Sequence, residues 1–307
     1  REELTEILLE IGEKPFRTKQ LWHWIYHQGA TDFSSMSSIA RPLQEKLAER
    51  FVISRPQAAT VQTSSDETRK FLFRFRDGQE AETVYIPDRR EDRGAVCISS
   101  QVGCTLSCTF CHTGTQGLVR NLGAAEIVGQ FMAARDSYGE WPSPRGETPR
   151  LLSTIVLMGM GEPLYNYENI AKAMKIIMDG EGIGLSRRRI TLSTSGVIPM
   201  MDQCGDELGI NLAISLHAVR DDLRDELVPL NRKYPIADLI AACRRYPAAS
   251  NARRITFEYI MLRGVNDSEA DARELVRLIA GIPAKVNLIP FNPWPGSRFQ
   301  PLSLIHI

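Results

Sequence analysis

Alternating strand and helix patterns after residue 95 constrain the fold of this chain more than any other feature. Six short apolar stretches typical of strands alternate there with amphipathic stretches typical of helices. The strand stretches are apolar on both faces, as parallel strands are when layers cover them. Six βα steps predict an α/β fold with a partial or complete (β/α) barrel, and an open doubly wound sheet is the rival. The expected strands are 95–100, 153–158, 189–193, 211–216, 254–261 and 285–290, and the expected helices are 124–137, 167–179, 198–204, 221–227, 236–246 and 268–280.

The first third of the chain has a different pattern. Residues 1–69 read as helical, with expected helices at about 2–11, from Thr18 to near Gly29, and at about 39–51. Residues 71–75 and 82–86 have the apolar alternation of two strands around an Asp77-Gly78 turn, which predicts a β-hairpin. We therefore expect a helical domain at 1–69, a hairpin extension at 70–94, and a partial (β/α)6 barrel at 95–301, followed by a short tail at 302–307.

Polar or glycine-rich stretches follow five of the expected barrel strands. A cysteine-rich loop follows the first strand, and residues 159–163 follow the second. Residues 193–196 and 215–217 end the third and fourth, and Asn292 follows the sixth. Because ligands bind at the carboxyl ends of parallel strands, these stretches predict a single ligand site at one rim of the sheet.

The cysteine-rich loop contains Cys104, Cys108 and Cys111 in the spacing C-x3-C-x2-C. Three thiolates can bind three irons of a [4Fe–4S] cluster and leave the fourth iron open to chelate a small molecule, the ligand set of radical S-adenosylmethionine (SAM) chemistry. The alternative is a structural zinc site, but such sites have four ligands. His112 directly follows Cys111 and cannot easily join the same face, and no second cysteine pair follows. The spacing therefore favours the cluster.

The overall composition is that of a soluble globular protein without a uniform charge. The 37 basic and 37 acidic residues give a formal net charge of zero, which argues against a uniformly basic nucleic-acid binder but not against a local basic patch. No apolar run reaches the length of a membrane span. Reduced thiolate ligands imply a reducing compartment, so we expect the protein in the cytoplasm, and Cys204 and Cys243 have the contexts of buried apolar residues.

The rim residues suit the binding of SAM, although each also has a structural interpretation. Gly161 allows close approach of the backbone to a ligand, and Glu162 could accept hydrogen bonds from an ammonium group, or could cap the turn before Pro163. The remaining polar rim residues could bind carboxylate, ribose or adenine, or could be strand-end caps; they are Ser193, Ser215, His217 and Asn292. By the same reasoning Cys97 is a buried thiol and Glu82 a solvated carboxylate on an edge strand.

Six stretches of this sequence closely resemble the RlmN family of dual-specificity RNA methyltransferases. The similarity extends from about Gly12 to Gly296. The stretches are long and occur in the family's order: 99–104, 116–117 with 120–122, 158–164, 191–197, 213–218 and 287–290.

The resemblance implies specific roles for these residues. Members of the family methylate C2 of an adenosine in 23S rRNA and of the adenosine beside the anticodon in certain tRNAs. They use two SAM molecules, an S-methylcysteine and a 5′-deoxyadenosyl radical. By resemblance, Glu82 is the proton acceptor and Cys97 the cysteine that resolves the RNA–protein intermediate by forming a disulfide. The cluster ligands would be Cys104, Cys108 and Cys111, and the SAM site would comprise Gly161, Glu162, Ser193, Ser215, Leu216, His217 and Asn292. The resemblance also implies that the helical domain at 1–69 is an RNA-binding accessory domain. A one-electron reductant such as flavodoxin and a monomeric state are also expected.

The sequence departs from the family near its C-terminus. The family's Ala-Ala-Cys-Gly-Gln stretch, which holds the methyl-carrying cysteine, is missing, and residues 302–307 look like the translation of a sequencing-library adapter. We expect a fragment that binds the cluster but does not methylate RNA. Two alternatives are the related adenine-C8 methyltransferase Cfr and, from a different class, a non-enzymatic zinc-containing RNA-binding protein.

Overall fold

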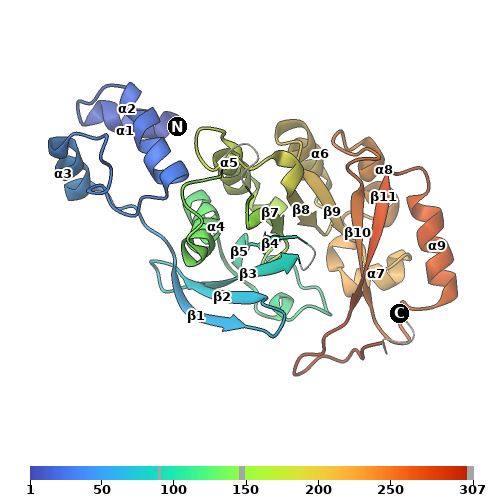
Figure 1. Ribbon diagram of the computed structural model, residues 1–307. Helices are drawn as coiled ribbons and strands as arrows, with labels where there is room; N and C mark the ends of the chain where they lie inside the picture. Colours follow the sequence, from blue (N-terminus) through green and yellow to red (C-terminus); the bar gives the residue numbers. More distant parts are fainter. Residues whose placement is uncertain (89–90, 145–148, 303–307) are drawn as a thin grey trace. The chain divides into compact units, whose positions relative to one another are not determined.

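A computed structural model describes residues 1–88, 91–144 and 149–302 of the chain (Figure 1). The chain divides into two compact units. Unit 1 comprises residues 1–96, 124–154 and 172–186, and unit 2 comprises residues 97–123, 155–171 and the chain from 187 onward. Within the described residues, no helix is both long enough and apolar enough to cross a membrane. Of the expected tail at 302–307, residues 303–307 lie outside the described residues.

The N-terminal part of unit 1 is helical, as the sequence predicts. Its helices are α1 (Glu2–Glu10), α2 (Phe16–Trp22), which continues as a π-helix over His23–Gln28, and α3 (Arg41–Arg50). Gly29 ends the π-helix with φ 77°, a left-handed conformation that favours glycine. The apolar faces of these helices pack into one core, whose most buried members are Leu8, Leu21, Met36, Leu43 and Leu47.

The strands of unit 1 confirm the predicted hairpin and correct the helical interpretation of 57–63. β2 (Arg69–Arg74) and β3 (Glu80–Asp88) pair in antiparallel fashion around Gly78. β1 (Gln57–Thr63) pairs with β2, so the prediction of helix throughout 1–69 is wrong for this segment. Every residue of β1 is exposed, so the strand has no core-facing alternation that the sequence could reveal.

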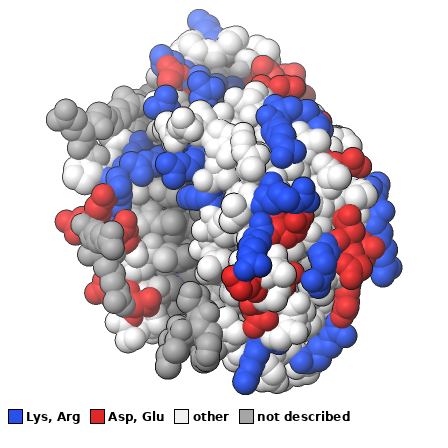
Figure 2. Space-filling view, turned by 90° about the vertical axis from the view of Figure 1, so that its right-hand side faces the viewer, with Lys and Arg blue, Asp and Glu red and all other residues white. Residues whose placement is uncertain are grey.

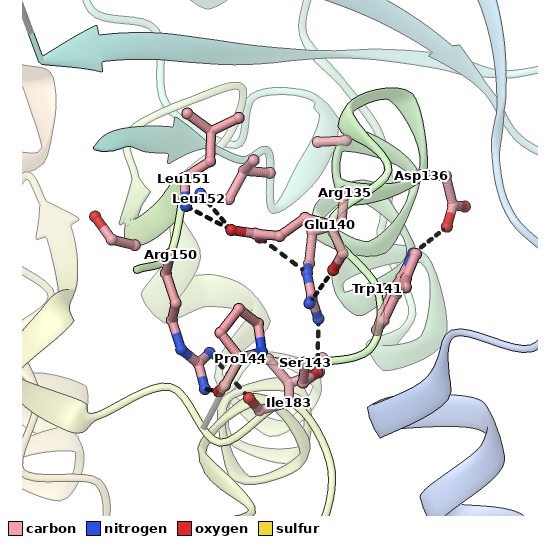
Figure 3. Close-up of polar contacts among 12 residues, drawn as sticks. Arg135, Asp136, Glu140, Trp141, Ser143, Pro144, Arg150, Leu151, Leu152 and Ile183 are labelled. Carbon is pink, nitrogen blue, oxygen red and sulfur yellow. Dashed lines mark hydrogen bonds and ion pairs between the residues drawn. The ribbon is translucent and has the colours of Figure 1, made fainter. Parts of the chain in front are cut away.

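Unit 1 also contains a buried polar cluster beside helix α4 (Ala124–Tyr138). Arg135 of this helix and Glu140 form an ion pair at 3.1 Å, and Glu140 also accepts hydrogen bonds from the backbone N–H groups of Leu151 and Leu152 (Figure 3). These contacts fix the chain just before β7 (Leu152–Leu157).

Unit 2 contains the parallel strands that the alternating pattern predicts, except for the first half of β7, which belongs to unit 1. Strands β7 to β11 lie side by side in chain order, and the pairs β7–β8, β8–β9, β9–β10 and β10–β11 are all parallel (Figure 1). A doubly wound sheet requires a point where the strand order reverses, and these five strands have none, so the barrel-type arrangement is confirmed. The later strands are β8 (Ile190–Thr194), β9 (Asn211–Ser215), β10 (Ile255–Met261) and β11 (Ala284–Pro290).

The helices of this region lie where the sequence predicts, within a few residues. They are α5 (Tyr167–Met178), α6 (Ile198–Glu207), α7 (Asp221–Leu227), α8 (Ile236–Arg245) and α9 (Glu269–Ile279). The first expected strand is shorter than predicted, because β4 (Arg93–Cys97) ends three residues early. The chain then forms a small antiparallel pair, β5 (Gln101–Gly103) with β6 (Leu118–Asn121), which brackets the cysteine loop.

One strand of unit 2 differs from the expectation of strands covered on both faces. Val286 and Leu288 of β11 are 38% and 43% exposed, whereas the central strands β8 and β9 are mostly buried. β11 pairs only with β10 among the described strands, so it forms an edge.

Candidate active site

A cavity of about 270 Å³ lies in unit 2 at the carboxyl ends of strands β7 to β10. One wall is the cysteine loop, and the other consists of strand ends and the turns that follow them. Eight of the site residues expected from the sequence line this cavity: Cys104, Cys108, Cys111, Gly161, Glu162, Ser193, Ser215 and His217. The structure therefore brings together groups that lie up to 113 residues apart in the chain, from Cys104 to His217.

The cysteine loop is closed at its base by the β5–β6 pair. The Cys104 N–H donates to the Gly117 carbonyl at 3.1 Å, and the Cys111 N–H donates to the Cys108 carbonyl at 3.1 Å. Gly103 has φ 73°, and a Cβ at this position would lie 1.8 Å from the Gly117 oxygen, so only glycine fits. The loop is thus held at its base in a conformation that leaves its three thiols at the cavity.

The electrostatics of these thiols fit a group that carries positive charge. Burial, with smaller contributions from the negative charges of Cys111 and Cys104, raises the pKa of the Cys108 thiol to about 12. Burial also raises the pKa of Cys104. Three thiolates in one cavity repel one another unless cations lie among them, which is what the irons of a cluster supply. Within the described residues, no group of three His, Cys, Asp or Glu side chains is placed to hold a single metal ion. Support for the cluster therefore comes from the spacing and the shared cavity.

Glu162 is a buried carboxylate in the wall opposite the cysteines. Its Oε1 accepts a hydrogen bond from the Leu164 N–H at 3.1 Å, and its Oε2 accepts one from the Ser195 N–H at 2.8 Å. Glu162 thus caps the short 3-10 helix Pro163–Asn166, and a further hydrogen bond from the Thr194 side chain leaves its carboxylate with one acceptor position for a ligand. Burial raises the pKa of Glu162 to about 7, partly offset by these hydrogen bonds, so an ammonium ligand would stabilise its ionised form.

His217 is buried at the cavity as a neutral imidazole. Its Nδ1 accepts a hydrogen bond from the Ile260 N–H at 3.1 Å, so the proton lies on Nε2, which is free to donate. Burial, with a smaller contribution from the nearby charge of Arg224, lowers the pKa of His217 to about 3. His217 has φ 62°, which is rare for a residue with a side chain; its backbone N–H donates to the Glu258 carbonyl at 3.3 Å and its carbonyl accepts from the Asn266 amide at 2.8 Å. The centroids of the His217 and Phe110 rings are 4.6 Å apart.

A row of polar side chains crosses the floor of the cavity from strand to strand. The Ser193 and Ser215 hydroxyls are 3.5 Å apart on β8 and β9. Glu258 is the register partner of both Ser215 on β9 and Asn287 on β11, and the Asn287 amide donates to its carboxylate at 2.6 Å. Burial raises the pKa of Glu258. Hydroxyls beside a carboxylate acceptor suit a ligand that carries neighbouring hydroxyl groups, such as a ribose.

Four expected site residues do not line the cavity. Leu216 is fully buried at the end of β9, and its backbone N–H donates to the carbonyls of Ile214 and Glu258. Asn292 follows β11 and is exposed. Cys97 ends β4 and is partly exposed rather than buried. Glu82 lies on β3 of unit 1, where it pairs with Lys70 at 2.9 Å. Cys204 and Cys243 are both buried, as expected.

Sequence reasoning missed two groups at the cavity. Phe110, between Cys108 and Cys111, contacts His217, and Glu258 contributes the carboxylate of the polar row. Glu258 lies in the run Ile-Thr-Phe-Glu-Tyr-Ile-Met of an otherwise apolar strand. A charged residue in the interior of such a strand is the signal that could have found it.

Comparison with known proteins connects this geometry to characterised families. Residues 1–53 match the family described as the ribosomal RNA large subunit methyltransferase N-terminal domain, and residues 147–276 match the radical SAM superfamily. Over 301 residues the chain is 86% identical to the dual-specificity RNA methyltransferase RlmN of Gluconobacter oxydans, covering 98% of this chain and 74% of that protein. The corresponding protein of Granulibacter bethesdensis is 83% identical, with 98% and 76% covered. A crystal structure of a radical SAM methyltransferase from Sphaerobacter thermophilus superposes with a TM-score of 0.89 at 44% identity, covering 99% of this chain and 87% of that one.

Proposed function

This chain belongs to the RlmN family of radical SAM RNA methyltransferases, and we propose that its cavity serves the methylation of adenine C2 in RNA. The substrates are a specific adenosine of 23S rRNA and the adenosine beside the anticodon in certain tRNAs. The observation that carries the proposal is the meeting of three thiols, a buried carboxylate and a neutral histidine around one cavity. The reaction belongs in the cytoplasm, with the protein acting as a monomer and a protein such as flavodoxin as reductant.

Different residues of the cavity bind the iron–sulfur cluster and SAM. Cys104, Cys108 and Cys111 hold a [4Fe–4S] cluster, which when bound supplies the electron for reductive cleavage of SAM. The buried carboxylate of Glu162 accepts a hydrogen bond from the amino group of SAM and faces its positive charge. Ser193 and Ser215 bind polar groups of the nucleoside, and the Nε2–H of His217 donates a hydrogen bond into the same space. Leu216 and Asn292 complete the SAM site.

Two further residues act on the RNA rather than on SAM. We assign Glu82 as the base that accepts the proton lost from the adenine ring, and its carboxylate forms an ion pair with Lys70. Cys97 resolves the covalent intermediate between protein and RNA. Its partial exposure fits a thiol that must react with a partner sulfur.

RNA binding in this proposal depends on local groups rather than on the field of the whole protein. Basic and acidic side chains are intermixed over the described part of the face in Figure 2, which agrees with the net charge of zero. The helices at the N-terminus, which match a ribosomal RNA methyltransferase domain, are the accessory part that holds RNA.

A polypeptide of these 307 residues should perform only part of the reaction. None of its six cysteines lies in an Ala-Ala-Cys-Gly-Gln stretch, so it has no methyl carrier of the family's kind. After anaerobic reconstitution with iron and sulfide, we expect reductive SAM cleavage, measured as 5′-deoxyadenosine, without methylated RNA. The Cys108→Ala variant is the matched control and should produce neither. Sustained methylation by the 307-residue polypeptide would contradict the proposal.

The position of the methyl group tests the RNA chemistry itself. The C-terminal segment of the Gluconobacter oxydans relative can be appended to this chain to restore a methyl carrier. Nucleoside digestion and mass spectrometry of 23S rRNA should then show 2-methyladenosine. An 8-methyladenosine product would support the Cfr-like alternative, and a colourless protein with zinc and without iron would support the non-enzymatic one.

A further inference from the structure

Arg224 is a fully buried arginine whose side chain touches only neutral groups. It lies on helix α7 with an exposed fraction of 0%. Its Nε donates to the Leu216 carbonyl at 3.0 Å, and its Nη2 donates to the carbonyls of Ser195 at 2.8 Å and Ser215 at 3.1 Å. Its Nη1 donates to the Asn231 side-chain oxygen at 2.8 Å. Within the described residues it forms no ion pair, so a permanent positive charge is buried without a direct counter-charge.

The same helix also holds the cysteine loop. The Thr109 N–H donates to the Leu227 carbonyl at 3.1 Å, and the Thr109 hydroxyl donates to the Glu226 carbonyl at 3.2 Å. Thr109 directly follows Cys108, and Leu227 lies three residues, or nearly one helical turn, after Arg224. Helix α7 therefore joins the thiols to the strand ends that form the SAM site, with Arg224 between them.

Among the described residues the positive charge of Arg224 has no direct counter-charge, but an anionic group bound in the cavity would supply one. Two carboxylates lie one group further out, because Asn231 donates to Asp221 at 2.9 Å and to Asp225 at 2.7 Å. On the other side lies the cysteine loop, because Thr109, the neighbour of Cys108, is bonded to the end of the same helix. A [4Fe–4S] cube on three thiolates is anionic, since the thiolates carry more negative charge than the oxidised cube carries positive charge, and it gains a further negative charge on reduction.

We propose that Arg224 is the buried counter-charge of the cluster, and that it eases reduction of the cluster while fixing the strand ends that bind SAM. The proposal rests on the cluster assigned above to the three cysteines. A fixed positive charge in a dry environment stabilises the more negative, reduced form more than the oxidised form. Arg224 is thus a positioning and electrostatic residue, which touches neither SAM nor the reacting atoms.

The test is an anaerobic redox titration of the reconstituted 307-residue protein, followed by electron paramagnetic resonance of the reduced cluster. At the potential where the native cluster is half reduced, Arg224→Gln should lower the ratio of reduced to oxidised cluster about tenfold, which is about 59 mV for one electron. Arg224→Lys keeps the charge and should stay within about threefold of the native ratio. Arg220→Gln is the matched control, because it removes a half-exposed charge from the start of the same helix and should change the ratio less than twofold.

A second variant keeps the proposal falsifiable if Arg224→Gln does not fold. Asp225→Asn removes a carboxylate near Arg224 and preserves an acceptor for Asn231, so it should raise the reduced-to-oxidised ratio. An unchanged ratio in Arg224→Gln, or a lowered ratio in Asp225→Asn, overturns the role of Arg224. A native protein that binds no iron overturns the cluster assignment as well, so the two failures are distinguishable.

Discussion

Two arginines are equally buried in this protein but are held in opposite ways. Arg135 in unit 1 is 1% exposed and Arg224 in unit 2 is 0% exposed. Burial lowers the pKa of each to about 10, so both remain charged at neutral pH. Arg135 faces a carboxylate, because its Nε pairs with Glu140 at 3.1 Å (Figure 3). Among the described residues, the Arg224 side chain donates hydrogen bonds only to carbonyl and amide oxygens.

The difference indicates what each charge is for. The charge of Arg135 is balanced within the fold by Glu140, and its Nη1 also donates to the Ser143 hydroxyl at 2.8 Å. The electric fields of the two paired charges therefore largely cancel outside this group of side chains. Arg224 leaves its field unbalanced beside the cavity that holds the three thiols. A buried ion pair has a structural explanation, because each charge balances the other. A buried charge without a partner instead indicates a bound ligand of opposite charge.

The largest expected effect is the loss of the iron–sulfur cluster when one of its cysteine ligands is replaced. Cys108→Ser should abolish the brown colour and nearly all bound iron, because a cluster held by three thiolates cannot keep a stable position with two. Absorbance near 400 nm and iron analysis measure this directly. Cys204→Ala, which changes a buried cysteine of the same unit, is the control and should retain iron. Iron retention in Cys108→Ser would place the metal elsewhere and end the comparison.

The next effect tests whether Arg135 has a purely structural role. Arg135→Ala leaves the Glu140 carboxylate without its buried partner and should cost about 3–5 kcal/mol in the free energy of unfolding. Urea denaturation measures this cost, and Arg135→Lys should lose less because it keeps the charge. The folded fraction of Arg135→Ala should show the native redox ratio of the cluster. A change in that ratio would mean that unit 1 also influences the cluster, contrary to the distinction drawn here.

A smaller effect concerns the carboxylate that shares the cavity with the cluster ligands. Glu162→Gln removes a charged acceptor and should weaken SAM binding by about 10- to 100-fold, in keeping with about 1.5–3 kcal/mol for a hydrogen bond to a charged group. Isothermal titration calorimetry measures the change. Glu168→Gln, an exposed carboxylate of helix α5, should bind SAM as the native protein does. Equal affinities in the two variants would remove Glu162 from the SAM site.

Glu162 should also give the apoprotein a specific pH dependence. Its pKa is raised from 4.5 to about 7 in the folded state, so between these pH values the folded chain binds more protons than the unfolded chain. Stability therefore falls as pH rises through this window, and the fall should be absent in Glu162→Gln. SAM binding should strengthen over the same window, because the ammonium group favours the ionised carboxylate. Thermal unfolding of the apoprotein at several pH values measures the first effect.

The sequence could predict the helices and strands of unit 2, and the polar residues at the strand ends, because both depend on short stretches of sequence. Apolar period and turn residues give the strands and helices of unit 2 to within a few residues, and helix α7 matches its predicted range of 221–227. The role of Arg224 on that helix could not be predicted. In the run Asp-Asp-Leu-Arg-Asp-Glu-Leu an arginine reads as part of a solvated face, and only the packing of the helix against β8 and β9 turns it inward.

Strand register explains the other omissions. Glu258 joins Ser215 in one polar row because β9 and β10 pair with these residues opposite each other, and periodicity within one strand does not contain this information. β1 was missed because an exposed strand has no buried face to alternate with. The sequence therefore indicates which residues lie at the rim, while neighbouring strands decide which of them share a face.

The smallest effect tests how tightly the contacts of Arg135 are satisfied. Ser143→Ala removes the hydroxyl that accepts from Arg135 Nη1 at 2.8 Å and donates to the Tyr26 carbonyl at 3.2 Å. A buried donor left without its acceptor should cost about 1–3 kcal/mol in the free energy of unfolding. Ser137→Ala is the matched control, because Ser137 is exposed on the helix of Arg135 and, within the described residues, its hydroxyl bonds only to the local Ala134 carbonyl. This change should cost less than about 0.5 kcal/mol. Equal losses of unfolding free energy in the two serine variants would show that Arg135 tolerates an unsatisfied N–H. The neutral hydrogen-bond acceptors around Arg224 would then no longer distinguish the two arginines.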